Sequence, residues 1–219
     1  DVLPRLFMKT VGAMANRQIA RELAIAPSTV DRQLARLGRH CLLVHQELRA
    51  RCQIAGPVAI DGFESFEFSQ YFPFHHNVAV EVETGFFLGF TTSPLRRKGR
   101  MRPDQKRRRA QLEARLGRPD PKAVERGMRD LLQILAKRGE TLHLRSDEHP
   151  AYLRALRGLA CPVVHRVTAS TERRDTGNPL FEVNLLDLLI RHSSANHRRE
   201  TIAWSKRRNG SSLRLAILL

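Results

Sequence analysis

Three things are scarce in this sequence of 219 residues: cysteine, acidic residues and long apolar runs. The three cysteines, Cys41, Cys52 and Cys161, lie far apart and form no Cys-x-x-Cys pair. A zinc ribbon or a disulfide framework is therefore not expected, and we interpret the three as small buried hydrophobic residues. No apolar run approaches the length of a membrane-spanning helix, and no signal-peptide pattern opens the chain. We therefore expect a soluble intracellular protein.

The shortage of acids leaves a large excess of positive charge. Lys and Arg together number 38 against 22 Asp and Glu, which gives a formal net charge of +16 and a sequence pI of about 11.2. So much like charge causes self-repulsion and is typical of a protein with a polyanionic partner. Nucleic acid is the first candidate for this partner, and an anionic membrane surface is the second.

Residues 16–38 have the pattern of two short helices joined by a turn. Asn16 can cap the first helix, and Pro27 suits the first position of the second, where its missing N–H costs nothing. Both helices carry an apolar stripe on one side. The outward positions of the second helix carry residue types that contact phosphates and base edges in a major groove: Ser28, Thr29, Arg32, Gln33 and Arg36. We predict a helix-turn-helix DNA-binding segment over residues 1–55; the alternative is an αα-hairpin whose basic face is merely solvated.

The rest of the chain, residues 56–219, alternates strand and helix patterns. A further helix from about Cys41 to Arg51 leads to Gly56-Pro57, which we take as the domain boundary. We expect strands at 58–68, 77–83, 86–91, 141–146 and 162–167, and helices at 121–137 (ended by Gly139), 152–158 and from 178 onward. The order β-β-β-α-β-α-β-α is that of ribonuclease-H-like domains. We predict an α/β fold with a mixed five-stranded sheet flanked by helices.

A dense basic run interrupts this order at about 95–120. Between Arg96 and Arg109 the chain carries nine basic residues and one acid, with a glycine and a proline among them. We predict an exposed, mobile insert, which is either a solvated loop or a phosphate-binding segment. The candidate phosphate contacts are Arg96, Arg97, Lys98, Lys106, Arg107 and Arg108.

Two aspartates follow strands that should lie side by side in such a sheet. Asp61 comes directly after the apolar run 58–60, and Asp147 comes after the strand at 141–146. Two carboxylates so close would repel each other unless a divalent cation neutralised them, and Mg²⁺ prefers hard oxygen ligands. We therefore predict that Asp61 and Asp147 hold Mg²⁺, or Mn²⁺ in its place, for phosphodiester chemistry. The alternative is that each aspartate merely ends its strand.

A third acid should come from the last helical region, which offers Glu182, Asp187 and Glu200. Asp187 lies on a polar stripe of an otherwise apolar helix, and a metal site would explain that stripe. Glu182 falls in the first turn, nearer the apolar side, whereas Glu200 stands among basic residues as a candidate salt-bridge partner. We favour Asp187 as the third metal ligand and catalytic residue, and we keep Glu182 as the second choice.

The histidines and the single tryptophan receive ordinary interpretations. The histidines near the acids and strands show no metal-ligand spacing, so we take them as surface or strand residues: His75, His76, His149 and His165. His149, two residues after Asp147, is the exception that merits a test by mutation. Trp204 is expected to pack against the core; the alternative is stacking on an unpaired base.

Several of these segments together resemble bacterial insertion-sequence transposases of the DDE class. The matching segments are the helix-turn-helix, Ala-Ile-Asp-Gly-Phe-Glu-Ser-Phe at 59–66, Arg-Ser-Asp-Glu-His-Pro-Ala-Tyr at 145–152, and the tail from Asn178 through Arg-Arg-Glu-Thr-Ile-Ala-Trp at 198–204. The resemblance covers nearly the whole chain. It implies a Mg²⁺-dependent DNA transposase that binds element ends, nicks DNA and joins 3′ ends to a target. Asp61 and Asp147 would match the first two acids of that family.

The resemblance also implies partners and a location. The partner would be double-stranded DNA, both element ends and target, with no membrane involved and with several copies of the chain assembled on the DNA. The protein would lie in the bacterial cytoplasm with the nucleoid. The alternative is a catalytically inactive or truncated transposase-derived DNA-binding regulator, and a nuclease on the same scaffold is a third possibility.

Overall fold

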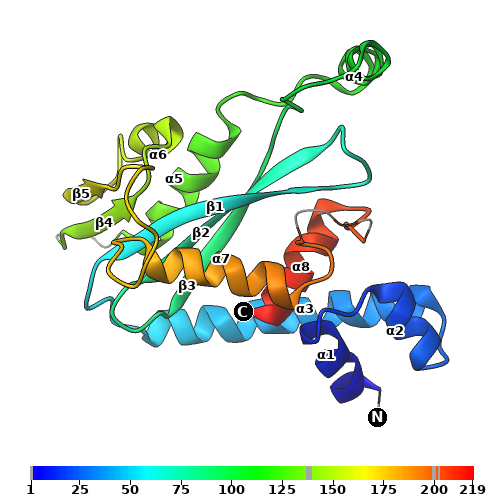
Figure 1. Cartoon of the computed structure of the whole chain (residues 1–219). Coiled ribbons are helices and arrows are strands. Elements are labelled where there is room, and N and C mark those ends of the chain that lie inside the picture. Colours follow the sequence, from blue (N-terminus) through cyan, green and yellow to red (C-terminus); the bar gives the residue numbers. More distant parts are fainter. Residues whose placement is uncertain (1, 137–139, 199–200, 202) are drawn as a thin grey trace.

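The computed structural model describes residues 2–136, 140–198, 201 and 203–219. The strands are β1 (Val58–Phe66), β2 (Pro73–Glu81), β3 (Phe87–Pro94), β4 (Leu142–Ser146) and β5 (Val163–Val167). The helices are α1 (Leu3–Val11), α2 (Asn16–Glu22), α3 (Pro27–Arg51), α4 (Pro103–Leu116), α5 (Ala123–Leu135), α6 (Pro150–Ala155), α7 (Phe181–Ser193) and α8 (Arg208–Leu218). Figure 1 shows how these elements surround one sheet.

The strands form a single mixed sheet in the order β3-β2-β1-β4-β5. β1 pairs antiparallel with β2, and β2 with β3, whereas β4 is parallel to both β1 and β5. The parallel strands are reached through the crossover helices α5 and α6, as parallel pairing requires. This confirms the predicted fold class, a mixed five-stranded sheet flanked by helices in the strand order of ribonuclease-H-like domains.

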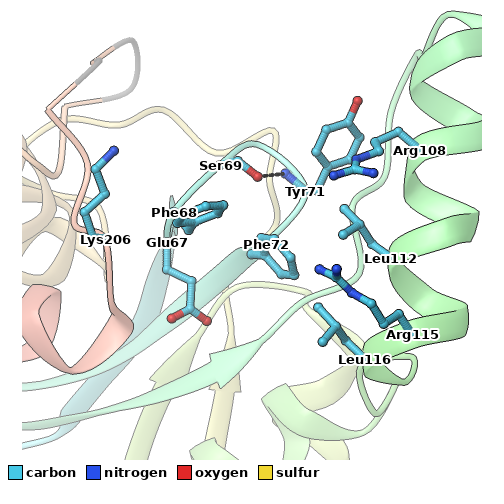
Figure 2. Close-up of a pocket in the computed structure, with 10 residues that line it drawn as sticks. All are labelled: Glu67, Phe68, Ser69, Tyr71, Phe72, Arg108, Leu112, Arg115, Leu116 and Lys206. Carbon is cyan, nitrogen blue, oxygen red and sulfur yellow. Dashed lines mark hydrogen bonds between the residues drawn. The ribbon is translucent and has the colours of Figure 1, made fainter.

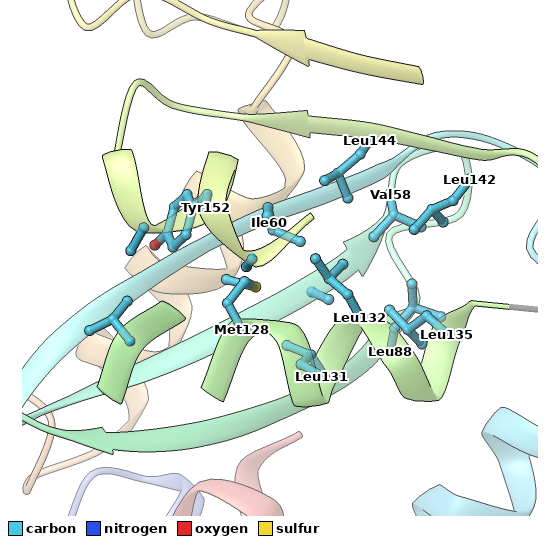
Figure 3. Close-up of a cluster of buried hydrophobic side chains, with 14 of the residues drawn as sticks. Val58, Ile60, Leu88, Met128, Leu131, Leu132, Leu135, Leu142, Leu144 and Tyr152 are labelled. Carbon is cyan, nitrogen blue, oxygen red and sulfur yellow. The ribbon is translucent and has the colours of Figure 1, made fainter. Parts of the chain in front are cut away.

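Helices cover both faces of the sheet (Figure 1). On one face, Ile60 of β1 belongs to a buried cluster with Leu131 of α5, which Figure 3 shows. On the other face, Ala59 belongs to a second cluster with Val183 of α7 and Leu215 of α8. Successive side chains of a strand point to opposite faces. The start of β1 is therefore an unbroken apolar run, because both of its faces are buried.

Strand β2 begins earlier than predicted. It starts at Pro73, so His75 and His76 are buried side chains of the sheet rather than residues before the strand. The antiparallel pairing with β1 runs without interruption from Glu81 back to Pro73. Every residue of β2 is buried, so the strand lacks along its first half the polar and apolar alternation by which strands are recognised.

The N-terminal pattern folds as α2 and α3, with Ala24 in the left-handed region (φ 52°) between them. The separate helix expected from about Cys41 is wrong, because α3 continues unbroken from Pro27 to Arg51. Gly38, where a helix end was expected, is instead the point at which α8 packs against α3. A Cβ at Gly38 would lie 2.8 Å from the Cβ of Leu213. The glycine therefore permits a close helix contact and does not end the helix.

The basic insert contains a helix, α4, which corrects the expectation of a loop; the mobility of the insert stays a prediction. Pro103 occupies the first turn of α4, and the side chain of Gln105 accepts a hydrogen bond of 3.0 Å from the backbone N–H of Arg102. Both features favour a helix start. Leu112 is the buried residue of α4. Figure 1 shows α4 lying well away from the sheet.

The last helical region, expected as one long helix, is divided into α7 and α8. Leu215 of α8 joins the sheet cluster that contains Val183, whereas Ile217 joins a third cluster with Leu6, Ile19 and Val30 of the N-terminal helices. The division of the chain at residue 56 stays a prediction, and the structure adds that α8 packs against both parts.

Two remaining features concern the helices of this fold. The expected end of the 121–137 helix at Gly139 falls outside the described residues, and α5 ends at Leu135. None of the described helices combines the length and the apolar character that crossing a membrane requires.

Candidate active site

Strands β1 and β4 bring Asp61 and Asp147 to the same edge of the sheet. Their parallel ladder pairs Val58 with Leu144 and Ala59 with Arg145. Asp61 and Asp147 each lie two residues beyond the last of these pairs. Because parallel strands keep their register, the two aspartates lie opposite each other where the strands separate. Both are partly buried.

Asp187 approaches this pair from α7. Along β1 the side chain of Asp61 alternates to the same face as Ala59, which is the face that α7 covers. Burial raises the pKa of Asp61 to about 7, the hydrogen bond from Gly62 lowers it, and the negative charges of Asp147 and Asp187 raise it further. Asp61 therefore lies within electrostatic range of both Asp147 and Asp187, and the assignment of the three acids to one site stays a prediction.

Tyr152 of α6 is a further member of this cluster that sequence reasoning missed. Its side chain is 1% exposed, and burial raises the pKa of its hydroxyl well above the usual value. The charges of Asp61, Asp147 and Asp187 raise that pKa further. The available signal was its place in the helix that begins directly after Asp147.

Each carboxylate is held by a neighbour in its own segment. An oxygen of Asp61 accepts a hydrogen bond of 2.7 Å from the N–H of Gly62, and Asp147 accepts one of 2.9 Å from the N–H of His149. Asp187 accepts one of 3.3 Å from Nε of Arg191, one helical turn further along α7. The acids are thus oriented by local contacts.

These acids have the oxygen donors that a metal ion needs, but their present placement does not bring those donors together around one site. Carboxylate oxygens are the ligands that Mg²⁺ and Mn²⁺ prefer. The pKa of Asp61 is raised chiefly by burial and in smaller part by the charges of Asp147 and Asp187, a repulsion that a divalent cation would relieve. In the described part of the chain, however, no three His, Cys, Asp or Glu side chains lie close enough together to hold a metal ion. Metal binding by Asp61, Asp147 and Asp187 therefore stays a prediction.

The two other candidates for the third acid have different positions. Glu182 lies in the first turn of α7, and its charge is not among those that act on Asp61 or Tyr152. Glu200 lies outside the described residues.

Two histidines lie beside each other near Tyr152: His75 is a buried residue of β2, in agreement with its interpretation as a strand residue, and His149 directly precedes α6. The rings of His75 and His149 are 6.3 Å apart, and that of His149 lies 4.8 Å from Tyr152. Burial lowers the pKa of His75 to about 4, while its hydrogen bond to Asn77 at 3.0 Å opposes the shift. Burial also lowers the pKa of His149. The sequence hint was the position of His149 two residues after Asp147.

The N-terminal candidates for DNA contact lie along the first half of α3. Ser28, Arg32 and Arg36 are exposed, and Thr29 and Gln33 are partly exposed. The apolar residues between them, Val30 and Leu34, are buried against the other N-terminal helices. The polar side chains are therefore accessible to a ligand, and DNA contact by them stays a prediction.

The candidates of the basic insert divide into two groups. Arg96 makes a bidentate ion pair with Glu113 of α4, at 2.8 and 3.0 Å, and Arg97 donates a hydrogen bond of 3.1 Å to the carbonyl oxygen of Gln70. These two side chains hold α4 and the β1–β2 turn in place. The others are exposed: Lys98, Lys106, Arg107 and Arg108.

Comparison with known proteins adds little to this geometry. No protein-family model matches the chain, and no curated protein matches it. Among solved structures, the chain is similar to the catalytic domain of Mos1 mariner transposase, with 12% sequence identity and a TM-score of 0.30, over 85% of this chain and 87% of that one. At that identity and TM-score the similarity assigns no function and no residue, so the candidate site depends on the geometry described above.

Proposed function

We propose that this chain is a DNA transposase of the DDE class, which binds the ends of an insertion element, cleaves the DNA and joins it to a target. The observation that carries the proposal is the convergence of Asp61, Asp147 and Asp187 at one edge of the sheet. Asp61 lies within β1, Asp147 directly follows the adjacent parallel strand β4, and the third acid comes from the helix on the face where Asp61 lies.

Asp61, Asp147 and Asp187 would hold Mg²⁺ or Mn²⁺, with Glu182 as the second choice for the third ligand. Such an ion, when bound, activates the attacking oxygen and stabilises the leaving oxygen of a phosphodiester. The local hydrogen bonds of the three acids keep their carboxylates oriented. His149 and Tyr152, whose rings contact each other and which feel the charges of these acids, would position the scissile phosphate.

Double-stranded DNA is the substrate that the charge of the molecule favours. The net charge is +16, and exposed cations occur on both α3 and α4. Ser28, Thr29, Arg32, Gln33 and Arg36 would contact element ends, while Lys98, Lys106, Arg107 and Arg108 would contact phosphates further along the same DNA. Two element ends must be held together, so we propose a homo-oligomer on the DNA, at the bacterial nucleoid.

One observation favours a second candidate, a catalytically inactive transposase-derived DNA-binding regulator. Asp187 is ion-paired with Arg191, and this arginine also donates a hydrogen bond of 3.4 Å to the carbonyl oxygen of His197. A carboxylate that keeps this pairing would be a poor metal ligand. The DNA-binding residues of α3 would be unaffected.

Cleavage of DNA carrying the inverted repeats that flank the coding sequence tests the two candidates. Purified protein is incubated with this duplex in Mg²⁺, in Mn²⁺ and in EDTA, and nicked and joined products are resolved on a gel. We expect products only with a divalent metal. Asp61→Asn and Asp147→Asn should each reduce the rate by about a hundredfold or more, because mutation of residues that only hydrogen-bond to metal ligands already reduces metal affinity or activity by about 10–100-fold.

The third acid is tested in the same assay. We expect Asp187→Asn to lose activity and Glu182→Gln to retain it; the reverse result would assign Glu182. Asp130→Asn, an exposed acid on α5, is the matched control and should be fully active. Binding of the duplex without nicking in either metal would establish the regulator, and full activity of both Asp61→Asn and Asp147→Asn would contradict the proposed site.

A further inference from the structure

A pocket of about 570 Å³ lies between the β1–β2 turn, helix α4 and the segment before α8. This volume is within the range typical of small-ligand sites. Figure 2 shows the aromatic residues of the turn facing α4 across the pocket, with Lys206 on a third side. The lining residues are Glu67, Phe68, Ser69, Tyr71, Phe72, Arg108, Leu112, Arg115, Leu116 and Lys206. The acids of the candidate active site do not take part in it.

Phe68 has an unusual backbone conformation and an exposed ring. Its φ is +60°, in the left-handed region that bulky residues rarely adopt, and its side chain is 65% exposed. Two hydrogen bonds hold it there: its N–H donates to the carbonyl oxygen of Ser205 at 3.0 Å, and its carbonyl accepts from Nε1 of Trp204 at 3.3 Å. Strain of this kind persists where the surroundings enforce it and concentrates at ligand sites.

The pocket combines aromatic faces with a cationic rim. Arg108, Arg115 and Lys206 are exposed cations at its edge. Among the described lining residues Glu67 is the one acid, and it is engaged by Arg208, whose N–H donates to it at 2.8 Å. The rim is therefore complementary to phosphate, and the rings of the turn are complementary to the flat face of a nucleobase.

We propose that this pocket binds an unpaired nucleotide of DNA, with the base stacked on Phe68 and the flanking phosphates on Arg108, Arg115 and Lys206. A paired base is already stacked on both sides within a duplex, so only an unpaired base can offer its face to the ring. This inference rests on the proposed DNA substrate and adds a second recognition site to it.

The position of the pocket relates it to the acids. Glu67 lies six residues beyond Asp61 along β1 and the start of the turn, which at about 3.3 Å per residue corresponds to roughly 20 Å. Successive bases of a strand in duplex DNA are about 3.4 Å apart. The captured base would therefore lie several nucleotides away from the phosphodiester at Asp61. At the position of that base, the two strands of an element end would be separated.

Metal-free binding assays test the proposal apart from catalysis. In EDTA, fluorescence anisotropy is measured with three probes of equal length: a single-stranded oligonucleotide, the corresponding duplex, and an abasic strand that carries phosphates without bases. We expect the single strand to bind about tenfold more tightly than the abasic strand, within the range found for base stacking. Phe68→Leu should remove that difference and leave duplex binding unchanged, whereas Phe68→Tyr, which keeps the ring, should retain it.

Two further variants separate stacking from a structural role. Phe68→Gly removes the ring and relieves the left-handed strain, so the Tm should stay the same or rise while the single-strand affinity falls about tenfold. Phe7→Leu is the matched control for Phe68→Leu, because it makes the same change at an exposed phenylalanine of α1. It should alter neither the Tm nor the affinity for the single strand.

Three outcomes would overturn the proposal. The first is equal affinity of the protein for the abasic strand and for the normal single strand. The second is wild-type affinity of Phe68→Leu and Phe68→Gly for the single strand. The third is a lower Tm of Phe68→Gly together with weaker binding of all three probes. Duplex binding without any of the expected differences would reject the pocket and leave the proposed function standing. Failure to bind all three probes would reject both.

Discussion

At the scale of single residues, the glycine beside Asp61 has a role that its sequence position alone does not reveal. A Cβ on Gly62 would overlap the carbonyl oxygen of His76 and would lie 2.8 Å from Nε2 of His75. The missing side chain allows the ring of His75 to pack against β1 next to the acids. The backbone N–H of Gly62 also donates the hydrogen bond that opposes the rise in the Asp61 pKa.

We predict that Gly62→Ala destabilises the protein. Because the overlap is partly with backbone, it cannot be relieved by a side-chain rotation, and we expect the free energy of unfolding to fall by roughly 1–3 kcal/mol. Urea denaturation followed by circular dichroism measures this quantity. Gly210→Ala is the control, since a Cβ there meets nothing within 4 Å, and it should cause no loss. Equal stability of the two variants would show that this packing is looser than described.

At the scale of elements, α8 is held against the sheet by a buried polar and aromatic cluster. His197, in the segment before α8, packs its ring 5.2 Å from His76 of β2 and 5.4 Å from Phe63 of β1. Asn196 donates a hydrogen bond of 3.3 Å to the hydroxyl of Ser211 in α8. Both histidines are almost completely buried, so the cluster tolerates them only in the neutral form.

This cluster predicts a loss of stability in acid. Burial, and then the charges of Arg214 and Arg191, lower the pKa of His197 from 6.5 to about 3. Between these two pKa values the unfolded chain binds more protons than the folded one. The contribution of the neutral, buried His197 to the free energy of unfolding is therefore complete above pH 6.5 and is lost as the pH falls toward 3. From pH 6.5 to 4.5 we expect a loss on the order of 2 kcal/mol from this group.

Denaturation at a series of pH values measures the effect. His197→Gln should flatten the dependence of unfolding free energy on pH, whereas His40→Gln, at an exposed position of α3, should leave it unchanged. A slope that is equally steep in His197→Gln would assign the acid sensitivity to other groups, of which His76 is the first candidate because burial lowers its pKa as well.

At the scale of the whole molecule, two separated places carry exposed basic side chains that we propose as DNA contacts. The exposed side chains of the first half of α3 lie on the N-terminal helices, whereas those of α4 lie beyond the far end of β1, as Figure 1 shows. A DNA ligand that contacted both would release counterions at both, and binding would depend steeply on salt.

We predict that duplex binding weakens linearly on a log–log plot against salt concentration. Arg32→Ala in α3 and Arg107→Ala in α4 should each reduce the slope by about 1, because each removes one phosphate contact. Arg126→Ala is the control, since this arginine is ion-paired with Asp120, and its slope should equal that of the unmodified chain. Unchanged slopes in all three variants would place the DNA elsewhere on the surface.

The sequence was informative wherever a local pattern matches a local structure. The run at 58–60 predicted a buried strand, and the strand order predicted a mixed sheet, from which the meeting of Asp61 and Asp147 follows. The sequence did not predict the start of β2, because burial on both faces removes the alternation of polar and apolar residues there. It also misplaced a helix end at Gly38, because that glycine permits close helix packing instead. The sequence also did not predict helix α4, because the density of charge in this segment indicates an exposed loop whereas the helix propensity of its residues favours a helix.

The sequence by itself determined the charge of the molecule, the order of its elements and the placing of Asp61 and Asp147 on or directly after neighbouring strands, because these depend on composition and on local periodicity. Only the tertiary structure decided which acid of α7 comes near them, since that depends on how the helix lies across the sheet. It alone also assembled Phe68, α4 and Lys206 into one pocket. Those residues are far apart in the chain, and no local pattern connects them.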